Sequence, residues 1–408
     1  MKGAGGAALR FRDFRLFWVS MLASGLAFQM AAVAIGWQVY AIDGDPLDLG
    51  LVGLAEFVPL PLLALPAGQL ADRLPRGAVF AVALVFEAFV AAGLIVTTLA
   101  GAGSLWPFLV LAFAIGCAVA VGSPAGRALT PALVPPELLA GALAVRSIAF
   151  QASAVAGPAL GGLLFAVRPE LVYVVTAGLS VLSLACVLGI RAGREVASSG
   201  AAGLDHVLGG VRLIRRTPVL LGAISLDLFA VLLGGAVALL PVFAKDILGV
   251  GPAGLGVLRS APAVGALIAA LLLARRPIGR HAGRKLLGVV VAFGLCMVVF
   301  GLSRSMWLSF AALAVSGGVD LVSVVLRQTI VPMVTPDELL GRVNAVEMVF
   351  ISASNELGAF ESGVAAALVG AVPAVVIGGV ATIAVAAVWG RMFPQLARVD
   401  RLDELRPA

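Results

Sequence analysis

The sequence predicts an all-α membrane protein with twelve transmembrane helices in two pseudo-symmetric six-helix bundles. Three observations predict this fold class: the composition, the recurrence of long apolar runs, and an internal repeat. The 408 residues are 61% hydrophobic and 12% charged, and the charged fraction is about half that of an average soluble domain. Apolar runs of about 20 residues follow one another along the chain, as in proteins that cross a membrane many times.

The hydropathy pattern places twelve spans, an even number that puts both termini on one side of the membrane. With the N-terminus in the cytoplasm, 24 of the 28 Lys and Arg residues lie in cytoplasmic segments or helix ends. Cationic loops stay in the cytoplasm, so we expect both termini there. The expected spans are residues 16–42, 48–71, 78–99, 105–127, 139–166, 171–190, 218–243, 252–274, 285–303, 307–328, 338–368 and 372–392.

The two halves of the chain resemble each other at a constant offset of 200 residues. Residues 127–141 read RALTPALVPPELLAG and residues 327–341 read RQTIVPMVTPDELLG, which aligns Arg127 with Arg327. Chance similarity between apolar segments is the alternative, but matched arginine, proline and acidic positions without a gap disfavour it. We therefore expect two parallel repeats of one bundle.

The repeat divides the chain into two bundles, a connector and a tail. Within the connector, apolar residues recur at helical spacing from Leu204 to Ile214, which predicts a short amphipathic helix on the membrane surface. A plain linker is the alternative. The tail is expected to be a charged, solvated end. The expected parts are an N-terminal bundle 1–190, a cytoplasmic linker 191–217, a C-terminal bundle 218–392 and a cytoplasmic tail 393–408.

Composition and missing motifs exclude several classes of function. The net charge of +6 is spread over many short loops, so no nucleic-acid-binding face is expected. Cys117, Cys186 and Cys296 all fall in apolar runs, which favours small core residues over disulfides or metal ligands. His206 and His281 lie in predicted loops without a nucleophile or metal constellation. No phosphate-binding loop is present, so we expect that ATP does not drive the protein directly. We also expect no cofactor and, since no suitable group surrounds the histidines, no metal and no enzymatic catalysis.

The turn between the second and third spans carries the most specific motif. Residues 68–77 read GQLADRLPRG, and Gly-x-Leu-Ala-Asp-Arg-x-x-Arg resembles the signature loop of major facilitator superfamily transporters. The resemblance implies a monomeric secondary transporter in which this turn locks the two halves at the cytoplasmic face against the start of the eleventh span. A purely topological basic turn is the alternative. The expected gate residues are Gly68, Asp72, Arg73, Arg76, Arg127, Arg327, Asp337 and Arg342.

The fifth span contains a second motif, the string GPALGG at residues 157–162. It resembles the motif that marks drug:proton antiporters, and hence exporters, in the same superfamily. Small residues permit close helix approach and a proline bends the helix, although ordinary bundle packing also produces such strings. Gly157, Pro158, Gly161 and Gly162 are the expected residues of the seam between helices.

Ionisable residues inside the spans are costly, so they indicate function. Glu56 and Arg259 occupy equivalent places in the two repeats, Asp227 and Asp320 lie in the seventh and tenth spans, and Glu87 in the third is the weakest candidate. A carboxylate beside an aqueous path can exchange a proton, which antiport requires. Pairing with arginines in a purely structural role is the alternative.

The eleventh span carries three carboxylates and an amide, Glu347, Asn355, Glu356 and Glu361. The segment resembles the corresponding part of a bacterial subgroup of enterobactin-exporter-like proteins, and this likeness extends over most of the chain. In the first span, Gln29 and Gln38 are candidate cavity residues, with core positions as the alternative.

Together these patterns predict an exporter of a small amphiphilic, drug-like or siderophore-like solute in a bacterial inner membrane. We expect proton antiport with alternating access, and no partner besides the solute, protons and the lipid bilayer. An importer or uniporter on the same fold is one alternative, and a membrane receptor that transports nothing is another.

Overall fold

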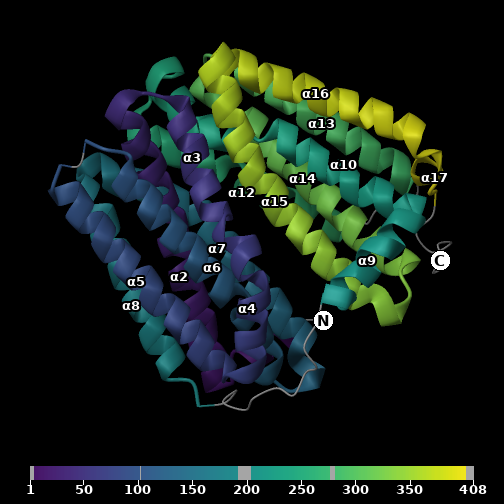
Figure 1. Cartoon of the computed structure of the whole chain (residues 1–408), viewed down its shortest axis with the longest axis horizontal. Coiled ribbons are helices and arrows are strands. Elements are labelled where there is room, and N and C mark those ends of the chain that lie inside the picture. The colour runs from purple at the N-terminus through teal and green to yellow at the C-terminus, as the bar shows by residue number, and fades with distance from the viewer. Residues whose placement is uncertain (1–3, 102, 192–203, 276–280, 401–408) are drawn as a thin grey trace. The chain divides into compact units, whose positions relative to one another are not determined.

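The described part of the chain, in this computed structural model, is residues 4–101, 103–191, 204–275 and 281–400. Within these ranges every regular element is a helix and no strand occurs. The helices divide into two compact units (Figure 1). Unit 1 comprises residues 1–44, 54–201 and 250–260, and unit 2 comprises residues 45–53, 202–249 and 261–408.

Unit 1 is built from long helices of the first half of the chain, and α2 packs against both α7 and α8 (Figure 1). It also contains the end of α3 (Pro46–Phe57) and the start of α12 (Gly251–Arg275). Its other elements are α1 (Ala4–Ala8), α2 (Arg12–Asp43), α4 (Pro59–Arg73), α5 (Arg76–Leu99), α6 (Trp106–Ala132), the 3₁₀ helix η1 (Pro136–Leu138), α7 (Leu139–Val167) and α8 (Pro169–Leu188).

Unit 2 holds the helices of the second half, with α13 packed against α14 and α16, and α10 against α15 (Figure 1). Its elements, besides its parts of α3 and α12, are α9 (Leu204–Arg216), α10 (Pro218–Gly234), the 3₁₀ helix η2 (Ala236–Leu239), α11 (Leu240–Val242), the π-helix η3 (Phe243–Ile247), α13 (Ala282–Leu302), α14 (Met306–Val334), α15 (Asp337–Val369), α16 (Ala371–Met392) and α17 (Pro394–Ala397).

Two of the expected spans are divided. The second span is two helices, because α3 ends at Phe57 and α4 begins at Pro59. Proline lacks an N–H and its ring clashes with the preceding turn, which places this break before Pro59. The seventh span is α-helical to Gly234, is interrupted at Gly235, whose φ of −74° and ψ of 63° are not helical, and then continues through η2, α11 and η3.

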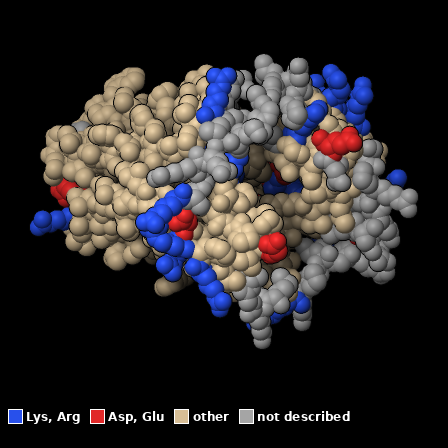
Figure 2. Space-filling model, turned by 90° about the horizontal axis from the view of Figure 1, so that it is seen from below, with Lys and Arg blue, Asp and Glu red and all other residues tan. Residues whose placement is uncertain are grey.

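Eleven helical segments within the described ranges are long and apolar enough to cross a membrane. The remaining expected span corresponds to α15, whose 33 residues would extend for about 50 Å. It differs from the others in carrying several acids. Large apolar side chains such as Phe89, Trp106 and Trp307 are exposed on the exterior, and Figure 2 shows a mostly tan face with charged side chains at separate places. Such a surface fits a lipid environment.

Glycines of the GPALGG string bring α7 close to two neighbours within unit 1. A Cβ on Gly157 would lie 2.6 Å from the Cβ of Gln29, and one on Gly161 would lie 2.8 Å from the Cα of Met30 on α2. On another face, a Cβ on Gly162 would meet the backbone of α12 at Pro252 and Gly256. Only glycine permits backbones to approach this closely.

The C-terminal segment corrects one expectation. Residues 394–400 were expected in a solvated tail, but Leu396 is fully buried and Val399 is 7% exposed, both in the core of unit 2. The N–H of Gly283 donates to the carbonyl of Val399, and the N–H of Ala282 donates to that of Asp400. These bonds supply acceptors for N–H groups that the first turn of α13 leaves free.

Candidate functional site

A buried guanidinium in unit 2 joins three helices. Arg327 on α14 is 3% exposed; its Nη2 lies 2.8 Å from Asp227 Oδ1 on α10, and its Nη1 lies 3.4 Å from Glu347 Oε1 on α15. The two carboxylates are also buried. We call Asp227, Arg327 and Glu347 the charge network.

Apolar residues on the same helices hold the charge network in place. Leu326 and Ile330 flank Arg327, and Ala230 and Val343 lie one turn from the two acids, all of them in the buried core of unit 2. A buried charge is tolerated when it is paired and hydrogen-bonded. The network therefore lies inside the helix bundle, although the Nε of Arg327 is buried without a hydrogen-bond partner in the described part of the chain.

Asp320 and Ser323 are two further polar residues on α14, the helix that carries Arg327. Asp320, Ser323 and Arg327 are spaced three and four residues apart, so they share one face of the helix. Asp320 is half-buried, and no hydrogen bond or ion pair of its carboxylate occurs among the described residues. It therefore lies within two turns of Arg327 without being bound to it.

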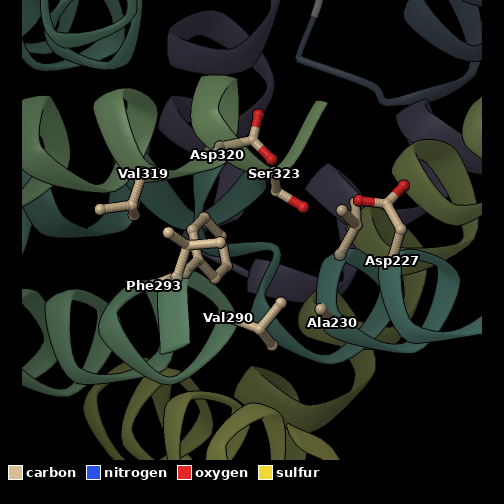
Figure 3. Close-up of a pocket in the computed structure, with 9 residues that line it drawn as sticks. Asp227, Ala230, Val290, Phe293, Val319, Asp320 and Ser323 are labelled. Carbon is tan, nitrogen blue, oxygen red and sulfur yellow. The ribbon is translucent and has the colours of Figure 1, made fainter. Parts of the chain in front are cut away.

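A narrow pocket connects Asp320 to the charge network (Figure 3). About 10 Å³ of it is open to the centre of a water molecule, roughly the space that one water needs. The remaining wall is apolar. The lining residues are Asp227, Ala230 and Val231 of α10, Val289, Val290 and Phe293 of α13, and Val319, Asp320 and Ser323 of α14.

The charges at this site do not balance. One guanidinium faces Asp227 and Glu347, and Asp320 adds a third carboxylate two helical turns away. Unpaired charges in an apolar interior are unfavourable by several kcal/mol, so the site favours an additional positive charge. Among the described residues, no group of three or more His, Cys, Asp and Glu side chains could hold a metal ion.

The other ionisable candidates are not in this pocket. Glu56 and Arg259 are half-buried in unit 1, and both make interactions. Within unit 2, a Cβ on Gly53 of α3 would lie 3.8 Å from Oε2 of Glu356. Glu361 is half-buried, whereas Asn355 is exposed and donates to the carbonyl of Ile351 at 3.0 Å.

The polar residues of α2 in unit 1 have packing partners. The amide of Gln38 bonds to the hydroxyl of Thr98 at 3.1 Å and accepts from the hydroxyl of Tyr173 at 3.0 Å. Ser24 donates to Glu87 at 3.0 Å. Gln29 lies against Gly157 of α7. Gln38 and Glu87 thus tie α2 to neighbouring helices.

The expected gate residues are described only in part. The side chains of Asp72 and Asp337 lie outside the described residues, as does any side-chain environment at Gly68. Arg73 and Arg127 are exposed. Arg76 donates to the carbonyl of Ala128 at 3.0 Å. Arg342 packs on Gly209 and Gly210 of α9, and Arg327, grouped with the gate on sequence grounds, lies in the charge network. The gate itself stays a prediction.

Two features of the site escaped the sequence analysis: the pairing of Arg327 with Asp227 and Glu347, and the presence of Ser323. The sequence did contain a signal for the pairing of Arg327. Arg127 and Arg327 are equivalent in the repeats, but position 347 is acidic whereas position 147 is Ser147. An acid that is present in only one of the two repeats, inside an apolar span, indicates that a cation of the same repeat pairs with it.

Comparisons with known proteins agree with this architecture. The family described as transmembrane secretion effector matches residues 4–405. The enterobactin exporter EntS of Shigella dysenteriae serotype 1 is 28% identical over 338 residues, which are 82% of this chain and 80% of that protein. EntS of Escherichia coli O139:H28 matches with the same identity and coverage.

Solved transporters share the fold. A bacterial homologue of the human lysosomal transporter Spinster superposes with a TM-score of 0.72 at 13% identity, over 98% of both chains. A bacterial homologue of the iron transporter ferroportin gives 0.71 at 18% identity, over 95% of this chain and 99% of that one. At these identities the likeness shows the fold alone. The predicted fold class is confirmed, and the protein is a multi-pass membrane transporter, not an enzyme. By its match over nearly the whole chain, it belongs to the transmembrane secretion effector family of the major facilitator superfamily.

Proposed function

We propose that this transporter exports a small amphiphilic solute in exchange for protons, and that Asp320 and the charge network bind the proton. The observation that carries the proposal is the unbalanced charge around Arg327. Two carboxylates compete for one guanidinium, and the carboxylate of Asp320, two turns away, forms no ion pair within the described part of the chain. Ionisable groups inside a membrane protein mark ion pathways in many transporters.

Protonation gives the site two states. With Asp320 charged, its carboxylate on α14 competes with Asp227 of α10 and Glu347 of α15 for the charge of Arg327. With Asp320 neutral, Arg327 is balanced more nearly by Asp227 and Glu347 alone, so the attraction across the three helices changes. A bound proton shifts a conformational equilibrium by a free energy equal to the difference between its affinities for the two conformations. The proposal therefore requires one alternating-access state to bind this proton more tightly.

The solute class follows from the relatives rather than from the pocket. The pocket at Asp320 has room for about one water molecule, so the solute would bind elsewhere. Relatives named enterobactin exporters make enterobactin the first solute to test, followed by other siderophore-like and drug-like amphiphiles. We expect Asn355, Glu356 and Glu361 of unit 2 to be candidates for solute contact. Glu56 and Arg259 are separate candidates within unit 1.

We place the protein in a bacterial inner membrane as a monomer with both termini in the cytoplasm. The support for this orientation is the bias of Lys and Arg toward alternate loops, because positively charged loops stay in the cytoplasm. Blue Lys and Arg side chains project at several places on the face seen in Figure 2, with fewer red acids. Fusing a reporter enzyme to either terminus would test this placement.

Transport into everted membrane vesicles tests the function. We expect energised vesicles to accumulate the solute and an uncoupler to abolish accumulation. Asp320→Asn should remove the response to the uncoupler, whereas Glu170→Gln, an acid on the first turn of α8 in unit 1, should leave it intact. Uptake that ignores the uncoupler in the unsubstituted protein would refute antiport, and accumulation in intact cells would indicate an importer.

A further inference from the structure

Ser323 is a polar residue that lines the pocket but makes no hydrogen bond with the charge network that would explain its position. It is 5% exposed, yet its hydroxyl makes no hydrogen bond to any described residue. Other buried serines of α14 bond to a carbonyl or hydroxyl, as Ser316 does to the carbonyl of Leu313 at 2.7 Å. A hydroxyl in an apolar interior is stabilised by a hydrogen-bond partner, and Ser323 lines the open space of the pocket, where a water can be that partner.

The position of Ser323 shows how a water could be that partner. It lies one turn from Asp320 on the same helix face, and in Figure 3 its hydroxyl points from α14 toward the Asp227 side of the pocket. The open space accommodates about one water molecule. A water there would have oxygen partners on both aspartates and on Ser323, which are the two to four polar partners that a buried water needs.

We propose that Ser323 and one water in this pocket carry a proton between Asp320 and Asp227. This inference rests on the proposed function, because it names the internal route of the same proton. Asp320 is partly exposed whereas Asp227 is buried, so the proton enters at Asp320. The protonated Asp320 donates to the water, the water donates to the Ser323 hydroxyl, and that hydroxyl donates its own proton to Asp227. Asp320 becomes a carboxylate and Asp227 becomes neutral.

The route ends at the charge network. Once Asp227 is protonated, its attraction for Arg327 weakens and Glu347 remains the charged partner of the guanidinium. The groups that face the pocket confine the transfer to this path. α10 contributes Asp227 and α14 contributes Asp320, while α13 contributes Val289, Val290 and Phe293, none of which ionises.

A pH jump followed by time-resolved infrared spectroscopy tests the relay on the full-length protein without any solute. Carboxyl C=O bands report protonation, and Asp320→Asn and Asp227→Asn assign them. We expect Asp320 to protonate first and Asp227 to follow. In Ser323→Ala, Asp320 should respond at the wild-type rate while Asp227 slows about fivefold to tenfold, the factor that corresponds to one hydrogen bond. Ala230→Val, which fills the pocket but keeps the hydroxyl, should slow Asp227 likewise.

Ser316→Ala is the matched control, because it removes a buried hydroxyl of α14 that does not line the pocket, and it should leave both rates unchanged. Wild-type rates for Asp227 in both Ser323→Ala and Ala230→Val would overturn the relay, as would the absence of any Asp227 protonation in the unsubstituted protein. The proposed function fails separately, if vesicle transport ignores the uncoupler while these spectroscopic rates still behave as expected.

Discussion

Replacing Arg327 by Gln should strongly destabilise the protein, because Arg327 is buried and bridges two buried carboxylates. The substitution leaves Asp227 and Glu347 buried without the cation that now lies 2.8 Å and 3.4 Å from them. Removing one partner of a buried ion pair typically costs about 3–5 kcal/mol. Asp227→Asn should cost less, about 2 kcal/mol, because Glu347 still balances the guanidinium.

The effects of Arg327→Gln and Asp227→Asn on the free energy of unfolding should not be additive. Once Arg327 is Gln, Asp227 is an uncompensated buried charge, so Asp227→Asn should restore part of the lost stability instead of lowering it further. The double-mutant cycle should give a coupling of about 2–3 kcal/mol, the upper range for groups in direct contact. Only a direct interaction predicts that the same substitution changes sign between the two backgrounds.

The free energy of unfolding in mixed micelles, titrated with a denaturing detergent and followed by circular dichroism, measures each variant. Arg284→Gln, an exposed cation at the start of α13, should change the free energy by less than about 0.5 kcal/mol. Additive effects of Arg327→Gln and Asp227→Asn would show that the ion pair does not form and would refute the electrostatic argument for the site.

Three further substitutions test the packing, each measured as the free energy of unfolding. Leu396→Ala should cost about 2–5 kcal/mol, as for a large-to-small core change, whereas the exposed neighbour Gln395→Ala should be neutral; equal effects would contradict burial of this segment. Gly162→Ala should cost about 1–3 kcal/mol by overpacking against the backbone of α12, while Gly178→Ala, with nothing within 4 Å of the added Cβ, should be tolerated. Glu87→Gln should stay within about 0.5 kcal/mol, since an amide still accepts from Ser24, and Glu87→Leu should lose that bond; a severe loss in Glu87→Gln would mean that the charge itself is needed.

The order of the apolar spans could be predicted from the sequence, because span length and apolar content depend on the bilayer rather than on tertiary contacts. Helix breaks and the burial of short segments could not be predicted, because they depend on tertiary packing. The break before Pro59 lies inside a continuous apolar run, and hydropathy does not register it. The burial of Leu396 belongs to a helix of four residues, which is too short to show periodicity.

The site could be predicted as separate positions but not as an arrangement. Asp227, Asp320 and Arg327 each stand out as charges in or beside apolar spans, since such charges are rare in membrane helices. Their pairing depends on how α10, α14 and α15 are rotated about their axes, and residues 100 positions apart give no local signal of that. Ser323 escaped notice because buried serines commonly bond to a carbonyl of their own helix, as Ser316 does.

The segment after α16 packs against α13, so unit 2 can finish folding only after this segment has been synthesised. Leu396 and Val399 complete the same core as Leu220, Leu286 and Ile330, so the core of unit 2 stays incomplete during synthesis until these two residues can pack. The ribosome holds newly made residues in its exit tunnel, so the core of unit 2 is completed only after Leu396 and Val399 have emerged from it. Fusion partners and truncations should begin beyond Asp400, because a stop placed shortly before Leu396 would yield a chain that inserts but cannot finish folding.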